Sequence, residues 1–175
     1  MLPVEHDFLP DSTAFVLVPP ERLTAPQIAT GLAAWTAARG TRRFPARHDI
    51  RPRDIASAMQ HMVLLKVEVN DFAFRIVGDG VVRAYDVALQ NRKLSEVARD
   101  EPGFAAMIIP VLREVTTNGE PIGIHGVVGH DVLRANFTNF EHLLLPLGPD
   151  DSTVDHVMVF TSHTTQPFLP KRVTS

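Results

Sequence analysis

Two glycines and an aspartate form the first group of residues in the chain that could do chemistry. The stretch "VGDGVVRA" places Gly78 and Gly80 at the spacing with which a phosphate-binding loop begins. A dinucleotide fingerprint needs a further glycine where this sequence has Arg83. No Gly-Lys-Ser or Gly-Lys-Thr follows, and Asp79 would repel a phosphate held between the two glycines. The pair therefore indicates the exit from a strand and not a nucleotide site.

Histidines form the second group. His125, His142 and His156 fall on three successive strand candidates, and imidazole is the commonest metal-binding side chain. Tight turns between these strands would pair His125 nearer Asn139, and His156 nearer positions 144–145, so the three rings would not converge. We interpret them as ordinary surface or cross-strand histidines and predict no metal site.

Acid-base pairs are suggested by Glu141 beside His142 and by Asp155 beside His156. Neighbouring residues on a strand point to opposite faces of a sheet, so neither pair is expected to cooperate in proton transfer. The serines and threonines also lack the sharp strand-to-helix turn of a nucleophile elbow. The sequence therefore predicts no catalytic residue.

A set of aromatic and methionine side chains has the character of a ligand-binding cavity. Two uses are open for such residues, because they line apolar pockets but more often simply fill a core. Tyr85 is the most informative member, since a buried hydroxyl needs a hydrogen-bond partner. The candidate ligand-binding residues are Phe74, Tyr85, Met107, Phe137, Phe140, Met158 and Phe160.

Composition limits the class of protein. A chain of 175 residues with 45% hydrophobic and 21% charged residues suits one globular domain with extensions. A net charge of -3 gives no general attraction to nucleic acid or to anionic membranes. The absence of cysteine excludes disulfides, thiolate metal sites and covalent attachment through sulfur. The N-terminal segment lacks the features of a signal peptide and no stretch is long enough to span a bilayer, so we expect a cytoplasmic protein.

The elements that must position these residues begin with an irregular extension, residues 1–23, in which "AFVLV" could dock as a short strand. A helix is predicted over 24–39. Thr24 and Gln27 match a capping box, and Gly40 provides the stop. The helix carries one large apolar stripe and an alanine-rich flank, which predicts a homodimer that uses Ala29, Ala33, Trp35 and Ala37.

A basic connector follows this helix. Six arginines lie between Arg39 and Arg53, interrupted by Pro45 and Pro52. Two interpretations stay open for the connector: a solvated, salt-bridged surface, or a contact for an anion or a partner. Pro52 suits the start of a short helix that ends near residue 60.

The remaining chain, 61–163, is predicted to form the core. A hairpin of two strands turns at Asn70 and Asp71, short helices lie within 80–98, and a long helix containing Pro110 ends at Asn118 and Gly119. Three further strands are expected in "PIGIHGVV", "NFTNFEHLLLPL" and "STVDHVMVFTSH", and residues 164–175 form a loose tail.

This order of elements, with the segments "WTAARGTRRFPARHDIRPRDI", "HMVLLKVEVNDFAFRIVGDGVVRAYDVALQNRKLSEV", "LLLPL" and "VDHVMVF", resembles a family of small bacterial stand-alone PAS proteins. The resemblance covers roughly residues 28 to 162. It implies an α+β fold: a five-stranded antiparallel sheet with helices on one face and an N-terminal flanking helix. It contains no catalytic motif.

The resemblance implies a sensory or interaction domain without enzymatic activity, which binds a small ligand or a protein partner and regulates a separate output protein. The sequence does not identify a cofactor. Without cysteine, the chain cannot form the covalent adduct of flavin photoreceptors. The long helix has no histidine that could serve as a conventional haem ligand. Two alternatives stay open: a small-molecule enzyme on a curved-sheet scaffold, and a ligand-free structural adaptor. An acid or base pointing into the concave face would favour the enzyme.

Overall fold

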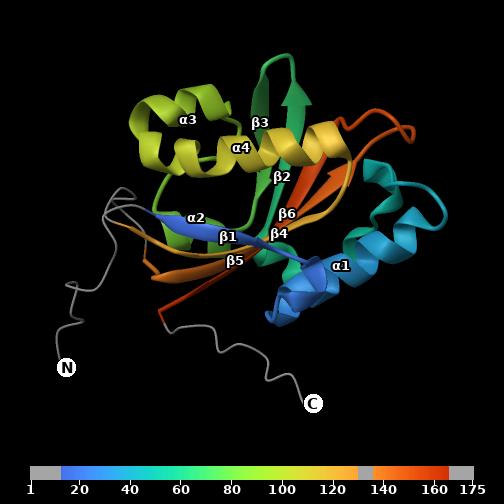
Figure 1. Ribbon diagram of the computed structural model, residues 1–175, viewed down its shortest axis with the longest axis horizontal. Helices are drawn as coiled ribbons and strands as arrows, with labels where there is room; N and C mark the ends of the chain where they lie inside the picture. Colours follow the sequence, from blue (N-terminus) through green and yellow to red (C-terminus); the bar gives the residue numbers. More distant parts are fainter. Residues whose placement is uncertain (1–12, 130–135, 166–175) are drawn as a thin grey trace.

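One antiparallel sheet organises the molecule, as the computed structural model in Figure 1 shows for residues 13–129 and 136–165. Its strands follow the order β1-β4-β5-β6-β2-β3. The short strand expected from "AFVLV" pairs with β4 at one edge, so the sheet has one strand more than the five expected. The strands are β1 (Ala14–Val18), β2 (Met62–Glu68), β3 (Asp71–Val77), β4 (Ile122–Val127), β5 (Asn139–Leu147) and β6 (His156–Thr164).

Helices lie on both sides of the sheet (Figure 1). Three of them, α2 (Asp79–Tyr85), α3 (Leu94–Asp100) and α4 (Pro102–Asn118), cover the face that we call inner. Helix α1 (Pro26–Arg39) packs on the opposite, outer face. Short 3-10 helices are η2 (Pro20–Arg22), η3 (Arg47–Asp49), η4 (Pro52–Asp54) and η5 (Ala56–His61). The expected α+β class, with helices on one face and a flanking N-terminal helix, is confirmed.

The predicted hairpin is present as β2 and β3, with its two-residue turn one position earlier in the sequence than expected. Glu68 pairs with Asp71, so the turn residues are Val69 and Asn70. Asn70 has a φ of 60°, a left-handed conformation that asparagine tolerates better than most residues.

Helix α1 has no capping box at its start, so the prediction of one from Thr24 and Gln27 was wrong. Its N-cap is Ala25, and no side chain of its own first turn caps it. The carboxylate of Glu141, from β5, accepts hydrogen bonds from the backbone N–H groups of Thr24 and Ala25 instead. A distant strand therefore supplies the cap. The C-terminal stop is as predicted, since Gly40 follows the helix with a φ of 58°.

Close packing fixes α1 on the sheet. A Cβ built on Gly31 would lie 2.3 Å from the ring of Phe160, so only glycine permits this approach. Trp35, 4% exposed, donates a 2.9 Å hydrogen bond from its indole nitrogen to the carbonyl of Pro146.

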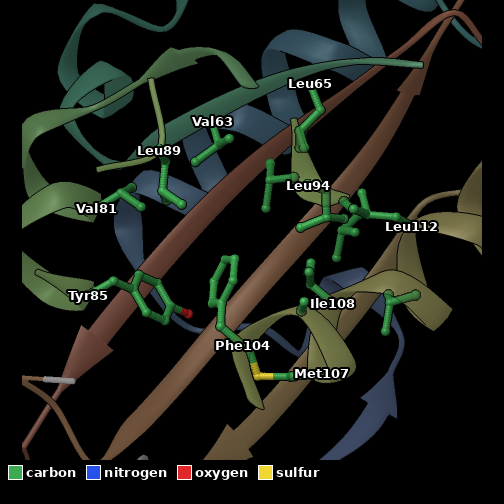
Figure 2. Packing of buried hydrophobic residues seen from close by; sticks show 14 of the residues in the cluster. Val63, Leu65, Val81, Tyr85, Leu89, Leu94, Phe104, Met107, Ile108 and Leu112 are labelled. Carbon is green, nitrogen blue, oxygen red and sulfur yellow. The ribbon is translucent and has the colours of Figure 1, made fainter. Parts of the chain in front are cut away.

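Two apolar clusters result from the alternation of side chains along the strands. On β2, Val63 and Leu65 belong to the inner cluster, beneath α2, α3 and α4, while Met62 and Leu64 belong to the outer cluster, beneath α1 and the connector. The central strands β5 and β6 are thus largely buried on both faces. Figure 2 shows the inner cluster from nearby.

Some expectations fall outside the described residues. Much of the expected N-terminal extension, at 1–12, and most of the expected tail, at 166–175, lie there. Over 13–129 and 136–165, none of the helices has the length and apolar character needed to cross a membrane.

Candidate functional site

The seven candidate ligand-binding residues divide between the two faces of the sheet. Met158 and Phe160 belong to the outer cluster, because even-numbered side chains of β6 point toward α1. The structure therefore does not bring these two together with the rest. The five in the inner cluster are Phe74, Tyr85, Met107, Phe137 and Phe140.

Tyr85 lies at the C-terminal end of α2 and points into the inner cluster, toward Phe104 (Figure 2). Its ring makes edge contacts with Phe104, at 4.9 Å between centroids, and with Phe137, at 5.1 Å. Burial raises the pKa of its hydroxyl, so the phenol is neutral. Within the described part of the chain, the hydroxyl lies 3.3 Å from the Nε2 atom of His142.

His142 carries this polar contact deeper into the sheet. Its Nε2 lies 3.3 Å from the Nε2 of His163, which stands on the adjacent strand β6. Desolvation is the main cause that lowers the pKa of His142 well below 6.5, and proximity to His163 lowers it further. The pKa of His163 is lowered to about 3, again mainly by burial. Both rings are therefore neutral at pH 7.

One ring nitrogen of His142 has no hydrogen-bond partner among the described residues. This atom is Nδ1, and it is buried, since the side chain is only 3% exposed. A neutral imidazole has one donor and one acceptor nitrogen, so this atom is an unsatisfied donor or acceptor in either tautomer. Leaving such an atom unpaired costs roughly 1–3 kcal/mol. A polar atom of a bound molecule would remove that cost.

His61 extends the polar series from His163 toward the surface. It ends η5, is half-buried, and its positive form would lower the pKa of His163. Desolvation and then Arg83 lower the pKa of His61 itself. We call Tyr85, His142, His163 and His61 the polar series.

Metal binding would require more than this series offers. The 3.3 Å separation of the two Nε2 atoms resembles an edge of a tetrahedral site. No third histidine, cysteine or carboxylate completes a possible metal group in the described part of the chain. A divalent ion there would also need a compensating negative charge, and the burial of Tyr85 disfavours its phenolate.

The three histidines considered from sequence occupy different environments. His125 pairs with Glu141, and His156 pairs with Leu147, so both predicted registers were wrong by two or more residues. His142 faces the inner cluster through its contact with Tyr85, whereas Ile124 is the inward residue of β4, so its neighbour His125 faces outward.

One of the two acid-base exclusions needs correction. The Nδ1 of His156 lies 2.9 Å from a carboxylate oxygen of Asp155, because β6 starts at His156 and Asp155 is not part of the strand. The other exclusion agrees with the structure: Glu141 binds the start of α1 on the outer face, while His142 points inward.

Two of the residues that sequence reasoning missed are His163 and His61. His163 lies on β6 in register with Phe140, and its ring centroid is 4.4 Å from that of Phe137. One signal was available in the sequence: His163 is an odd-numbered residue of β6, as are Val157 and Val159, so its side chain should point to the same face of the sheet. The register with β5 was needed to place it beside His142.

The glycine pair has a packing role. A Cβ on Gly78 would lie 2.4 Å from the backbone oxygen of Gln60, and one on Gly80 would lie 2.7 Å from it. The pair lets the start of α2 approach the end of η5. This geometry agrees with a strand exit.

The surface of α1 differs from the proposed dimer interface in one residue. Ala29, Ala33 and Ala37 are exposed, as the prediction requires. Trp35 is buried against β5 and offers no surface to a partner. Its assignment to the interface was wrong, because the large apolar stripe of α1 is used within the monomer.

A protein-family model matches the sequence of this chain over most of its length. The model, described as a PAS domain, matches residues 24–160. The chain belongs to the PAS domain family. Searches of curated proteins and of solved structures gave no match. The match includes α1 and the connector, the four strands from β2 to β5, and the first part of β6. PAS domains are generally sensory or interaction modules without enzymatic activity, and often mediate dimerisation or protein interaction.

Proposed function

We propose that this PAS domain is a non-enzymatic sensor that binds a small ligand in its inner cluster and regulates a separate output protein. The observation that carries the proposal is the Tyr85–His142 contact inside an apolar cluster, with the Nδ1 of His142 unpartnered. Ligand pockets combine an apolar lining with a few polar groups, and this cluster has that composition. We also propose that the protein is cytoplasmic and of bacterial origin.

The chemistry of the interior favours an uncharged ligand. Both histidines that approach Tyr85 are held neutral by burial. An ionised group placed beside them would lose its hydration without gaining an opposite charge. We expect an apolar or aromatic ligand with one polar atom that hydrogen-bonds to His142, while Tyr85, Met107, Phe137, Phe140 and Phe74 contact its apolar body.

The enzyme alternative gains one observation, because His142 is a potential acid or base that points inward. Its lowered pKa and its neighbours, a phenol and a second neutral imidazole, suit hydrogen bonding better than proton transfer at pH 7. The adaptor alternative requires only that the inner cluster stay filled by side chains. Ligand retention separates both from the sensor.

Native mass spectrometry of freshly purified protein, together with its visible spectrum, tests the proposal. We expect a stoichiometric non-covalent adduct that is lost or weakened in Tyr85→Phe and His142→Phe. Met158→Leu, on the outer face, is the matched control and should keep the adduct. An adduct-free wild type that also gains no mass from a library of uncharged aromatic compounds would reject the sensor. Substrate turnover that depends on His142 would favour the enzyme.

We also propose that the domain forms a homodimer through the exposed alanines of α1, Ala29, Ala33 and Ala37. Small side chains let two helices approach closely, and two-fold dimers are the commonest homo-oligomers. Sedimentation should show a dimer at micromolar concentration, and Ala33→Glu or Ala37→Glu should dissociate it. A monomeric wild type, or a dimer unaffected by both charges, would contradict this interface.

A further inference from the structure

An apolar groove lies on the outer face, on the part of the sheet next to α1. It has a volume of about 200 Å³ and is lined by Met59, Met62, Leu64, Ile76, Met158 and Arg47, among others. We call it the outer groove. Its floor comes from β2, β3 and β6, and its wall comes from the connector between α1 and β2.

Large apolar side chains are exposed in the outer groove. Met59 is 40% exposed and Ile76 is 36% exposed, although both stand beside the outer cluster. Three of its lining residues are methionines, whose flexible side chains suit surfaces that accept more than one apolar shape. Exposed apolar surface of this kind is typical of interaction sites.

The size of the groove decides between a small molecule and a macromolecule. Small-molecule sites usually enclose roughly 300–1,000 Å³. A volume of about 200 Å³ is smaller, and suits one or two apolar side chains presented by a protein segment.

Charge decides the chemistry of that segment. Arg47 lines the groove, and within the described residues no ion pair engages its guanidinium. Arg51 and Arg53, on either side of Pro52, share the single carboxylate of Asp54. A carboxylate of a partner can therefore pair with Arg47 without displacing an existing partner.

The free edge of β3 is closed to an added strand along much of its length. Phe74 exchanges backbone hydrogen bonds with Arg92 and Asn91, and the side chain of Gln90 bonds to the N–H of Val77 and the carbonyl of Arg75. A partner that reaches this end of the sheet must therefore use side chains in the groove.

We infer that the outer groove binds an acidic segment of a partner protein, with one or two bulky apolar side chains in the groove and a carboxylate on Arg47. The inference rests on the proposed function only in assuming that output passes through a separate protein. It assigns a role to part of the basic connector, and it places the partner on the face opposite the proposed ligand site.

Selection from a displayed library of random 12-residue peptides, followed by NMR of protein labelled with ¹³C at the methionine methyls, tests this inference. The chain has five methionines, which keeps the spectrum simple. We expect selected peptides to combine Asp or Glu with bulky apolar residues and to shift Met59, Met62 and Met158. Met107, in the inner cluster, should not shift.

Matched variants separate the groove from general surface effects. Arg47→Glu and Ile76→Asp should weaken the selected peptides about tenfold or more. Arg113→Glu, at an exposed position of α4, and Val82→Asp, at 39% exposure on α2, should leave binding unchanged.

Four results would overturn the inference: no enriched peptide, enrichment of basic peptides, shifts confined to Met107, or broadening of the groove methionines by self-association alone. Shifts confined to Met107 would instead locate binding in the inner cluster. The ligand proposal is tested separately by the mass of the purified protein, so either proposal can fail while the other survives.

Discussion

Replacing Glu141 with glutamine tests whether a buried carboxylate from β5 holds the start of α1. Glu141 is 1% exposed, and one of its oxygens accepts hydrogen bonds from the N–H groups of Thr24, at 2.9 Å, and Ala25, at 3.1 Å. The other oxygen lies 3.1 Å from the N–H and 3.0 Å from the hydroxyl oxygen of Thr24. Glutamine keeps the shape but replaces one acceptor oxygen with a donor NH₂ group.

The size of the effect follows from the donors that lose their acceptor. At least one buried N–H group is left unsatisfied, at about 1–3 kcal/mol. The negative charge at the N-terminus of α1 is also lost, which contributes up to about 2 kcal/mol in a partly buried position. The variant no longer has to bury a charge, which offsets part of the loss. We therefore expect Glu141→Gln to lower the free energy of unfolding by about 2–4 kcal/mol, a large share of the ~5–15 kcal/mol of a typical domain.

Urea unfolding with two probes measures this loss. Trp35 is the only tryptophan and lies in α1, so its fluorescence reports the docking of that helix. Far-UV circular dichroism reports the whole fold. The matched control is Glu120→Gln, whose side chain is 70% exposed and lies 3.6 Å from Arg43. An exposed ion pair contributes little, so the control should change stability by less than about 0.5 kcal/mol.

The two probes also test where the loss occurs. If the cap acts locally, the Trp35 transition of Glu141→Gln should shift to lower urea more than the circular dichroism transition does. Stability of Glu141→Gln within about 0.5 kcal/mol of the wild type, or equal to that of Glu120→Gln, would refute the reasoning.

Two further predictions concern the glycine pair and the buried histidines. Gly78→Ala should destabilise the fold by about 1–3 kcal/mol in urea unfolding, because its Cβ would lie 2.4 Å from the backbone oxygen of Gln60; an unchanged midpoint would contradict the packing role. Burial lowers the folded-state pKa of His142 and His163 below 6.5, so the unfolded chain binds protons on these rings before the folded chain does. The free energy of unfolding should therefore be highest above about pH 6.5 and fall below it, by up to ~1.4 kcal/mol per pH unit for each ring. For His163 the loss continues toward its folded-state pKa of about 3. Urea unfolding at several pH values between 7 and 5 measures this loss. The free energy of unfolding should depend less on pH in the double variant His142→Gln/His163→Gln than in the wild type, whereas exposed His48→Gln should keep the wild-type dependence. An equal pH dependence in the double variant and the wild type would rule out this cause.

The sequence alone determined the elements that depend on local chemistry. Alternating apolar residues around Asn70 predicted the β2–β3 hairpin, and Gly40 predicted the end of α1, because turn and stop signals act within a few residues. The missing third glycine after Gly80 was enough to exclude a dinucleotide loop. The order of strands and helices also led to the correct family.

Local reasoning failed where a distant residue replaced the local partner. Thr24 and Gln27 had the pattern of a capping box, but the carboxylate of Glu141 accepts the hydrogen bonds of the N–H groups at the start of α1. Trp35 was assigned to the dimer interface, but its indole N–H donates a hydrogen bond to the carbonyl of Pro146 within the monomer. In both cases a stronger or more buried contact was available only after the sheet had formed.

The candidate site depended on tertiary structure most of all. Met158 and Phe160 were separated from the other candidates because alternation on β6 assigns them to the outer face. His142 met His163 and Tyr85 because the β5–β6 register and the position of α2 bring the three side chains together. A shift of one residue in register reverses the face of every side chain on a strand, so contacts between strands cannot be obtained from residue types alone.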